Sequence, residues 1–151
     1  MKKFAFKLEP LLKLRRNERM LRQQHLAEVL RQDDELVDQR RRTEAERELQ
    51  IAELRTLSAS GRDFDIDASS SRRHYAVQLV GRMNEIDQQR AALAGRIEEC
   101  RQALVRADQA VQSLEKLAEK QRAEFLFQQE RQEARVLEET WQAIHAGECV
   151  P

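Results

Sequence analysis

Glycine and proline are scarce in this sequence, with four glycines and two prolines among 151 residues, and aromatic residues make up only 5%. A layered domain of this size needs turn residues between its elements and bulky side chains in its core. The composition therefore disfavours a compact domain. Ala, Glu, Lys, Leu and Arg together supply more than half of the chain, which indicates long helices.

Residues that carry chemistry are equally sparse. Cys100 and Cys149 lie too far apart to suggest a metal site or a disulfide framework, and His25, His74 and His145 stand alone. The sequence has no Gly-rich phosphate loop, no His-x-x-x-His pair and no Gly-x-Ser-x-Gly turn. We expect no catalytic residue, no cofactor or metal site, no small-molecule substrate and no enzymatic activity.

Long apolar runs are missing. No window approaches the roughly 20 apolar residues of a membrane span. The first ten residues, Met-Lys-Lys-Phe-Ala-Phe-Lys-Leu-Glu-Pro, do not form the uninterrupted apolar segment of a secretory signal. We therefore expect the protein to be made and kept in the cytosol.

The charge is balanced overall but unevenly distributed. Residues 1–22 contain eight Lys/Arg and two Glu, a net charge of +6, whereas residues 114–148 contain five Lys/Arg and eight Glu, a net charge of −3. If the chain folds back on itself, its basic start lies beside its acidic end. A charge-matched helix pair explains this pattern better than a nucleic-acid or membrane patch does.

The clearest pattern in the chain is a heptad repeat from residue 79 to residue 125. Spacings of four and three residues alternate without interruption, and only Arg90 and Gln121 are polar. Such a repeat predicts one strand of a coiled coil, which needs a second helix to cover its narrow apolar face. We call the following positions the inner seam: Leu79, Met83, Ile86, Arg90, Leu93, Ile97, Cys100, Leu104, Ala107, Val111, Leu114, Ala118, Gln121 and Phe125.

A less regular helical pattern precedes this repeat. We predict a first helix over about 8–57, a loop over 58–70 and a second helix over about 71–145. Gly61 suits the end of the first helix, and Asp67 or one of Ser69–Ser71 can cap the second. A short connection makes neighbouring helices antiparallel. The predicted fold is all-α, a single long antiparallel two-helix coiled-coil hairpin whose second helix is longer.

The unequal helix lengths predict a register and an overhang. At about 1.5 Å per residue, the helices would measure roughly 75 and 110 Å. With residue 57 opposite residue 71, Arg40, Arg41 and Arg42 lie near Glu85 and Asp87, in the polar middle of the first helix that is the weakest part of the seam. The second helix then extends beyond the first, and its apolar residues imply a partner protein, a second copy of the chain or a frayed amphipathic tail. These residues include Phe125, Leu126, Phe127, Leu137, Trp141 and Ile144.

The opening residues resemble a known family. Phe4-Ala-Phe6-Lys-Leu8-Glu-Pro-Leu11-Leu12-Lys-Leu14-Arg15-Arg16-Asn-Glu18 and the later Leu114-Glu-Lys-Leu117-Ala-Glu-Lys120 are similar to blocks of the FliJ family. This family is the small coiled-coil component of the bacterial flagellar protein-export apparatus. The length and the longer second helix agree with it, whereas the Ser-rich loop and the Trp141 tail have no counterpart that we recognise.

The resemblance implies a stalk-like hairpin whose terminal end enters the pore of a hexameric export ATPase. Other surfaces would contact the membrane export gate and the export chaperones, at the cytoplasmic side of the inner membrane beneath the flagellum. No nucleic acid is implied. The expected ATPase-binding residues are Phe4, Phe6, Leu8, Leu11, Leu12, Arg15, Arg16 and Leu117; Arg40, Arg41, Arg42, Phe125 and Trp141 are expected to serve other partners.

Two other functions agree with the same residues. The related coiled-coil component of a virulence-type secretion system would share the hairpin shape. A general structural coiled coil that dimerises through the tail would use the apolar residues from Phe125 to Ile144. Stimulation of an export ATPase would separate either export component from the structural coiled coil.

Overall fold

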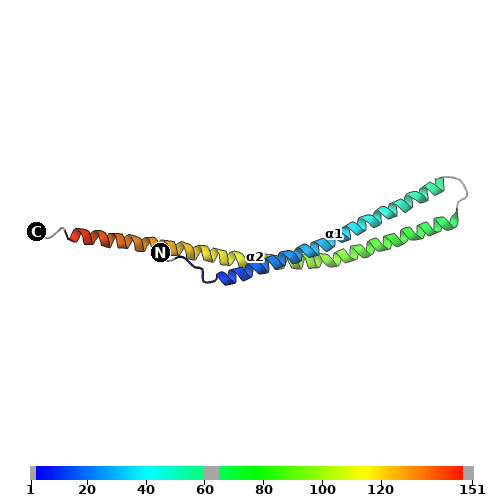
Figure 1. The fold of residues 1–151 in the computed structure, drawn as a ribbon. Coiled ribbons are helices and arrows are strands. Elements are labelled where there is room, and N and C mark those ends of the chain that lie inside the picture. The colour runs from blue at the N-terminus through cyan, green and yellow to red at the C-terminus, as the bar shows by residue number, and fades with distance from the viewer. Residues whose placement is uncertain (1–2, 60–64, 148–151) are drawn as a thin grey trace. The chain divides into compact units, whose positions relative to one another are not determined.

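The computed structural model describes residues 3–59 and 65–147, and these residues form two long helices (Figure 1). Helix α1 spans Glu9–Ala59 and helix α2 spans Ile66–Ala146. No strand occurs within the described ranges. The helices pack against each other, which confirms the predicted all-α helical hairpin with a longer second helix.

The chain divides into two compact units. Unit 1 combines Met1–Met20 with Val105–Pro151, and unit 2 comprises Leu21–Leu104. Both helices contribute to both units, so each unit contains one helix pair.

In unit 2, three ion pairs establish the direction and register of the helices. Arg72 pairs with Glu53, Arg40 donates to Asp87 at 2.8 Å, and Arg90 donates to Asp33 at 2.9 Å. Residue numbers rise along α1 as they fall along α2, so the helices are antiparallel. The predicted proximity of Arg40 to Asp87 is confirmed.

The inner seam faces α1 along almost its whole length. Leu79, Met83, Ile86, Ala107 and Val111 are buried, and every other seam position except Gln121 is half-buried. A repeat of 3.5 residues keeps one stripe of α2 against its neighbour, which is the physical reason for this agreement.

The start of α2 differs from the prediction. The helix begins at Ile66 rather than at residue 71, and its cap is Asp65 rather than Asp67 or Ser69–Ser71. The Asp65 carboxylate accepts hydrogen bonds from the backbone N–H groups of Asp67 at 3.0 Å and Ala68 at 3.2 Å. These bonds satisfy two otherwise free donors of the first turn, so the serines enter the helix and Ser69 is buried. Gly61 and Cys149 lie outside the described residues.

The polar middle of α1 is packed through its hydrophilic side chains. Arg40, Thr43, Glu44 and Arg47 are half-buried, while Leu49 is exposed. The long arms of arginines can cover apolar surface while their charged groups stay in water. In this part of unit 2 the buried apolar residues therefore come from α2.

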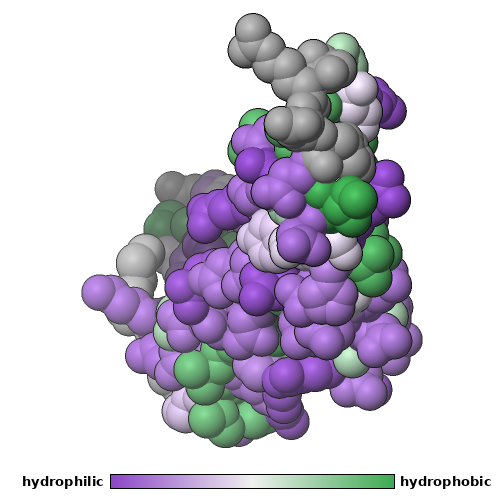
Figure 2. Space-filling model, turned by 90° about the vertical axis from the view of Figure 1, so that its right-hand side faces the viewer, coloured by the Kyte–Doolittle hydropathy of each residue, from purple (hydrophilic) through white to green (hydrophobic). Residues whose placement is uncertain are grey.

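Hydrophilic side chains dominate the face seen in Figure 2, where apolar side chains occur as separate small patches. Within the described helices, no stretch is apolar enough to cross a membrane.

Candidate protein-binding surface

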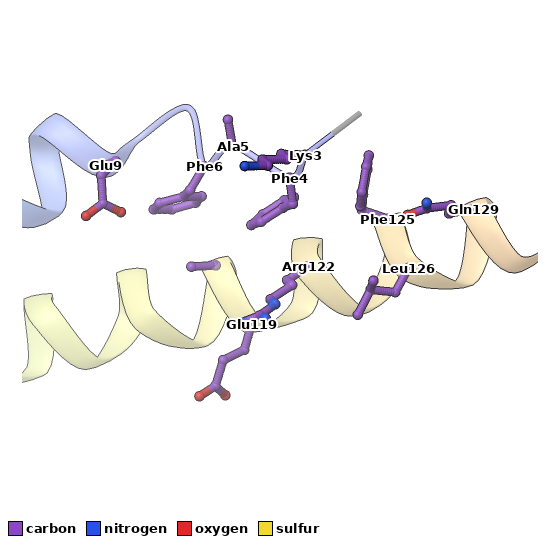
Figure 3. A pocket seen from close by; sticks show the side chains of 11 residues that line it. Lys3, Phe4, Ala5, Phe6, Glu9, Glu119, Arg122, Phe125, Leu126 and Gln129 are labelled. Carbon is purple, nitrogen blue, oxygen red and sulfur yellow. The ribbon is translucent and has the colours of Figure 1, made fainter. Parts of the chain in front are cut away.

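The N-terminal segment, residues 3–8, extends the packing of unit 1 beyond the start of α1. Phe4 and Phe6 point from this segment toward α2, and Phe125 rises from α2 beside Phe4 (Figure 3). The Phe4 and Phe125 ring centroids are 5.7 Å apart with a tilt of 47°. This separation lies within the range favoured by aromatic pairs. Two predicted partner-binding residues therefore contact each other within the chain.

An open groove follows this contact. Its volume is about 810 Å³, and its walls include Phe6 and Glu9 on one side and Ala118, Arg122 and Leu126 on the other. The groove is mixed in character because apolar rings and side chains lie beside a glutamate and an arginine. Such a surface suits a protein segment better than a small apolar ligand, which needs an enclosed pocket.

Four leucines lie at or just before the start of α1, and of Leu8, Leu11, Leu12 and Leu14 only Leu12 is buried. Leu12 is only 3% exposed, so it holds the helices together. Leu8 and Leu11 are 38% and 37% exposed, and Leu117 of α2 matches them at 37%. All three leucines belong to unit 1 and lie between the Phe4–Phe125 contact and the Arg16–Glu115 ion pair. We call Leu8, Leu11 and Leu117 the leucine rim.

Most of the nearby arginines already have acidic partners. Arg16 pairs with Glu115 and Arg19 pairs with Asp108, each at 3.0 Å across the helices, and Arg15 pairs with Glu18 along α1. The basic N-terminal region is thus partly neutralised by α2, as the charge pattern predicted. Lys13 has no ion pair among the described residues, so it adds positive charge near the leucine rim.

The three consecutive arginines of α1 have different surroundings. Arg40 binds Asp87 and Glu44, whereas Arg41 and Arg42 are exposed. Arg42 lines a shallow polar groove of unit 2 together with Glu85 and Gln89. Arg40 therefore holds the two helices in register, and only its two neighbours offer charge to another molecule.

The last part of α2 has no covering helix among the described residues. From residue 130 to residue 147, every side chain is exposed. Trp141 is 61% exposed and stacks on His145 at a centroid distance of 4.1 Å. Phe125 belongs to the packed region, while Trp141 belongs to this uncovered one. The predicted register placed both residues in the overhang because the first helix ends before it reaches the level of residue 125.

The described residues contain no group of three or more His, Cys, Asp or Glu side chains positioned to hold a metal ion. Cys100 is a free, half-buried thiol in the inner seam. What the geometry offers is helix surface, in the form of a leucine rim, a mixed groove and an uncovered helix face. These features describe a helical hairpin with accessible apolar and mixed surfaces. No family model, curated protein or solved structure matches this chain.

Proposed function

We propose that this chain is a protein-export component of the FliJ type, which binds a hexameric export ATPase through its terminal end and promotes ATP hydrolysis there. The leucine rim is the observation that carries the proposal. Leu8, Leu11 and Leu117 remain accessible beside basic side chains, although the neighbouring Leu12 is buried. A mixed apolar and basic surface of this kind fits a protein partner, since accessible leucines gain from burial and charges steer association.

The mode of action would be a shift of conformational equilibrium. A hairpin that binds one conformation of the ATPase subunits more tightly than the others stabilises that conformation. It can promote assembly and turnover in this way without any reacting group of its own. In this proposal the protein is not an enzyme, and it acts in the cytoplasm beside the export gate and its chaperones.

The test is the rate of ATP hydrolysis by a purified flagellar-type export ATPase with and without the full chain. We expect stimulation, and we expect Leu11→Asp to remove most of it because the aspartate must be desolvated in the contact. Leu21→Asp is the matched control, since Leu21 is an exposed leucine of the same helix outside the leucine rim. Both variants should keep the helix content of the parent chain.

Absence of both binding and stimulation would reject the export function in favour of a structural coiled coil. If Leu11→Asp and Leu21→Asp reduced the stimulation of ATP hydrolysis equally, the leucine rim would be rejected as the contact with the ATPase. Parallel assays with a flagellar and a virulence-type ATPase would separate the two export systems, because the cognate enzyme should respond at lower protein concentration.

A further inference from the structure

The apolar residues of α2 change faces near residue 125. Beyond Phe125 the spacing of the inner seam continues only through polar residues, at Gln128, Gln132, Arg135, Glu139 and Gln142. A second alternation of four and three residues begins at the same point on the opposite face. We call these residues the outer stripe: Ala123, Phe127, Glu130, Ala134, Leu137, Trp141 and Ile144.

The outer stripe is uncovered in the structure. Phe127, Leu137, Trp141 and Ile144 are all more than half exposed, and Leu137 reaches 71%. The N-terminal segment packs on the other face, through the contact of Phe4 with Phe125. The outer stripe begins where the apolar part of the inner seam ends, and it lies on the opposite face of α2. It is therefore suited to pack against a helix other than α1.

We propose that the outer stripe pairs with the outer stripe of a second copy of this chain, as an antiparallel helix pair. Placing Ala134 opposite Leu137 of the second copy also places Phe127 opposite Ile144. Small residues then face large ones, and aromatic residues face aliphatic ones. Trp141 faces Glu130, where the indole N–H can donate to the carboxylate. One polar layer of this kind fixes the register at some cost in stability.

The flanking charges support a second copy as the occupant. In this register Arg131 of each chain lies beside Glu138 of the other, and Glu124 lies beside His145. The two-fold symmetry of the pair repeats each contact. In the single chain Arg131 instead lies over the Phe127 ring, with its guanidinium carbon 5.8 Å from the ring centroid.

The same charges disfavour a parallel pair. A parallel arrangement brings Glu133 of one chain beside Glu138 of the other, twice in each dimer, and aligns the two Glu130 carboxylates in the apolar layer. Like charges at such positions destabilise a coiled coil and select against that orientation. The outer stripe covers about three heptads, near the lower limit for a coiled coil, so the dimer should form reversibly with concentration.

Analytical ultracentrifugation of the full chain over a range of concentrations tests this proposal. We expect a monomer–dimer equilibrium. We expect Leu137→Asp to raise its dissociation constant by at least about tenfold, because the variant places a charged carboxylate in the apolar layer between the two helices. Val136→Asp is the matched control. Val136 is its exposed neighbour on the same helix and lies off the outer stripe, so this variant should leave the dimer intact.

Charge reversal tests the orientation. Arg131→Glu should weaken the dimer because it places two carboxylates together, and adding Glu138→Arg should restore the parent dissociation constant to within about threefold. A chain that stays monomeric at every concentration would overturn the proposal. Equal weakening of the dimer by Leu137→Asp and Val136→Asp would also overturn it. Failure of the double charge reversal to restore association would overturn the antiparallel register.

The dimer does not depend on the export function. A monomeric chain that stimulates the ATPase would overturn only the dimer, and a dimer without stimulation would overturn only the export function.

Discussion

Arg90 and Asp33 join the two helices of unit 2 through a two-pronged ion pair. The Arg90 Nε donates to Oδ1 at 2.9 Å, and Nη2 donates to Oδ2 at 3.4 Å. The hydrogen bond to Asp33 and the charge of this carboxylate raise the pKa of the Arg90 guanidinium. Arg90 is also a polar residue in an otherwise apolar part of the inner seam, and a polar seam residue with a matched partner favours one register over its neighbours.

Reversing one charge of this pair should therefore lower the stability of the fold, and reversing the other charge as well should restore most of it. Arg90→Asp places two carboxylates opposite each other, so we expect a lower thermal midpoint by circular dichroism. Asp33→Arg combined with Arg90→Asp should recover most of the loss. As a control, Arg31→Asp disrupts an exposed pair within one helix and should have a smaller effect. No recovery in the double variant would contradict the assigned register.

The inner seam was predictable because one physical constraint determines it. A stripe that repeats every 3.5 residues has to meet a second helix, so the burial of Leu79 and Val111 follows from spacing alone. The pairing of Arg40 with Asp87 followed from the position of the loop. These features depend on a local repeat and one turn.

The cap of α2, the packing of Phe4 and the exposure of individual leucines could not be predicted from the spacing of residues. Several Asp and Ser residues between 65 and 71 could cap a helix, and spacing does not reveal which one adopts the required backbone geometry. The N-terminal segment offered no helical pattern, so its packing through Phe4 was not visible in the periodicity. The division of the leucines into a buried Leu12 and an accessible Leu11 required the orientation of α1.

The cap of α2 gives a stability prediction. Asp65→Ala should lower the free energy of unfolding by about 1 kcal/mol, because the first-turn N–H groups of Asp67 and Ala68 lose their acceptor. Asp65→Asn is the control, since asparagine caps helices about as well as aspartate. Urea denaturation measures both, and an equal loss in the two variants would contradict the capping role.

Two valines of α2 provide a matched test of the seam. Val111 is 0% exposed and Val105 is 54% exposed. Val111→Ala should cost about 1–2 kcal/mol of unfolding free energy, since the lost apolar burial exceeds the gain in helix propensity. Val105→Ala removes the same atoms from an exposed position and should change stability by less than about 0.5 kcal/mol. Similar losses at both positions would place the seam on another face of α2.

The carboxyl group of Glu28 gives a pH prediction. Its pKa is lowered, first by the hydrogen bond from Arg31 and then by the positive charge of that residue. The folded pKa lies below the unfolded one, so this contact stabilises the helix at neutral pH, and its contribution disappears as the pH falls through the lowered pKa. NMR titration should place the Glu28 midpoint below the usual value of about 4.3, and Arg31→Gln should return it. An unchanged midpoint in that variant would exclude Arg31 as the cause.

The contact between Phe4 and Phe125 gives a test of the N-terminal segment. Both rings are half-buried and they lie 5.7 Å apart, a geometry in which aromatic pairs contribute about 0.5–1.5 kcal/mol beyond their burial. A double-mutant cycle with Phe4→Ala and Phe125→Ala should therefore give a coupling energy of that size in urea denaturation.

A second cycle separates this contact from a general effect of losing aromatic surface. Phe127 lies two residues from Phe125 but is 59% exposed on the outer stripe, so Phe4→Ala and Phe127→Ala should be additive at concentrations where the chain is monomeric. Coupling of Phe4 to Phe125 alone places the segment on the inner face, which leaves the outer stripe free. Equal coupling to both rings would instead mean that the segment reaches around α2 and competes with a second copy, and dimerisation would then have to displace it.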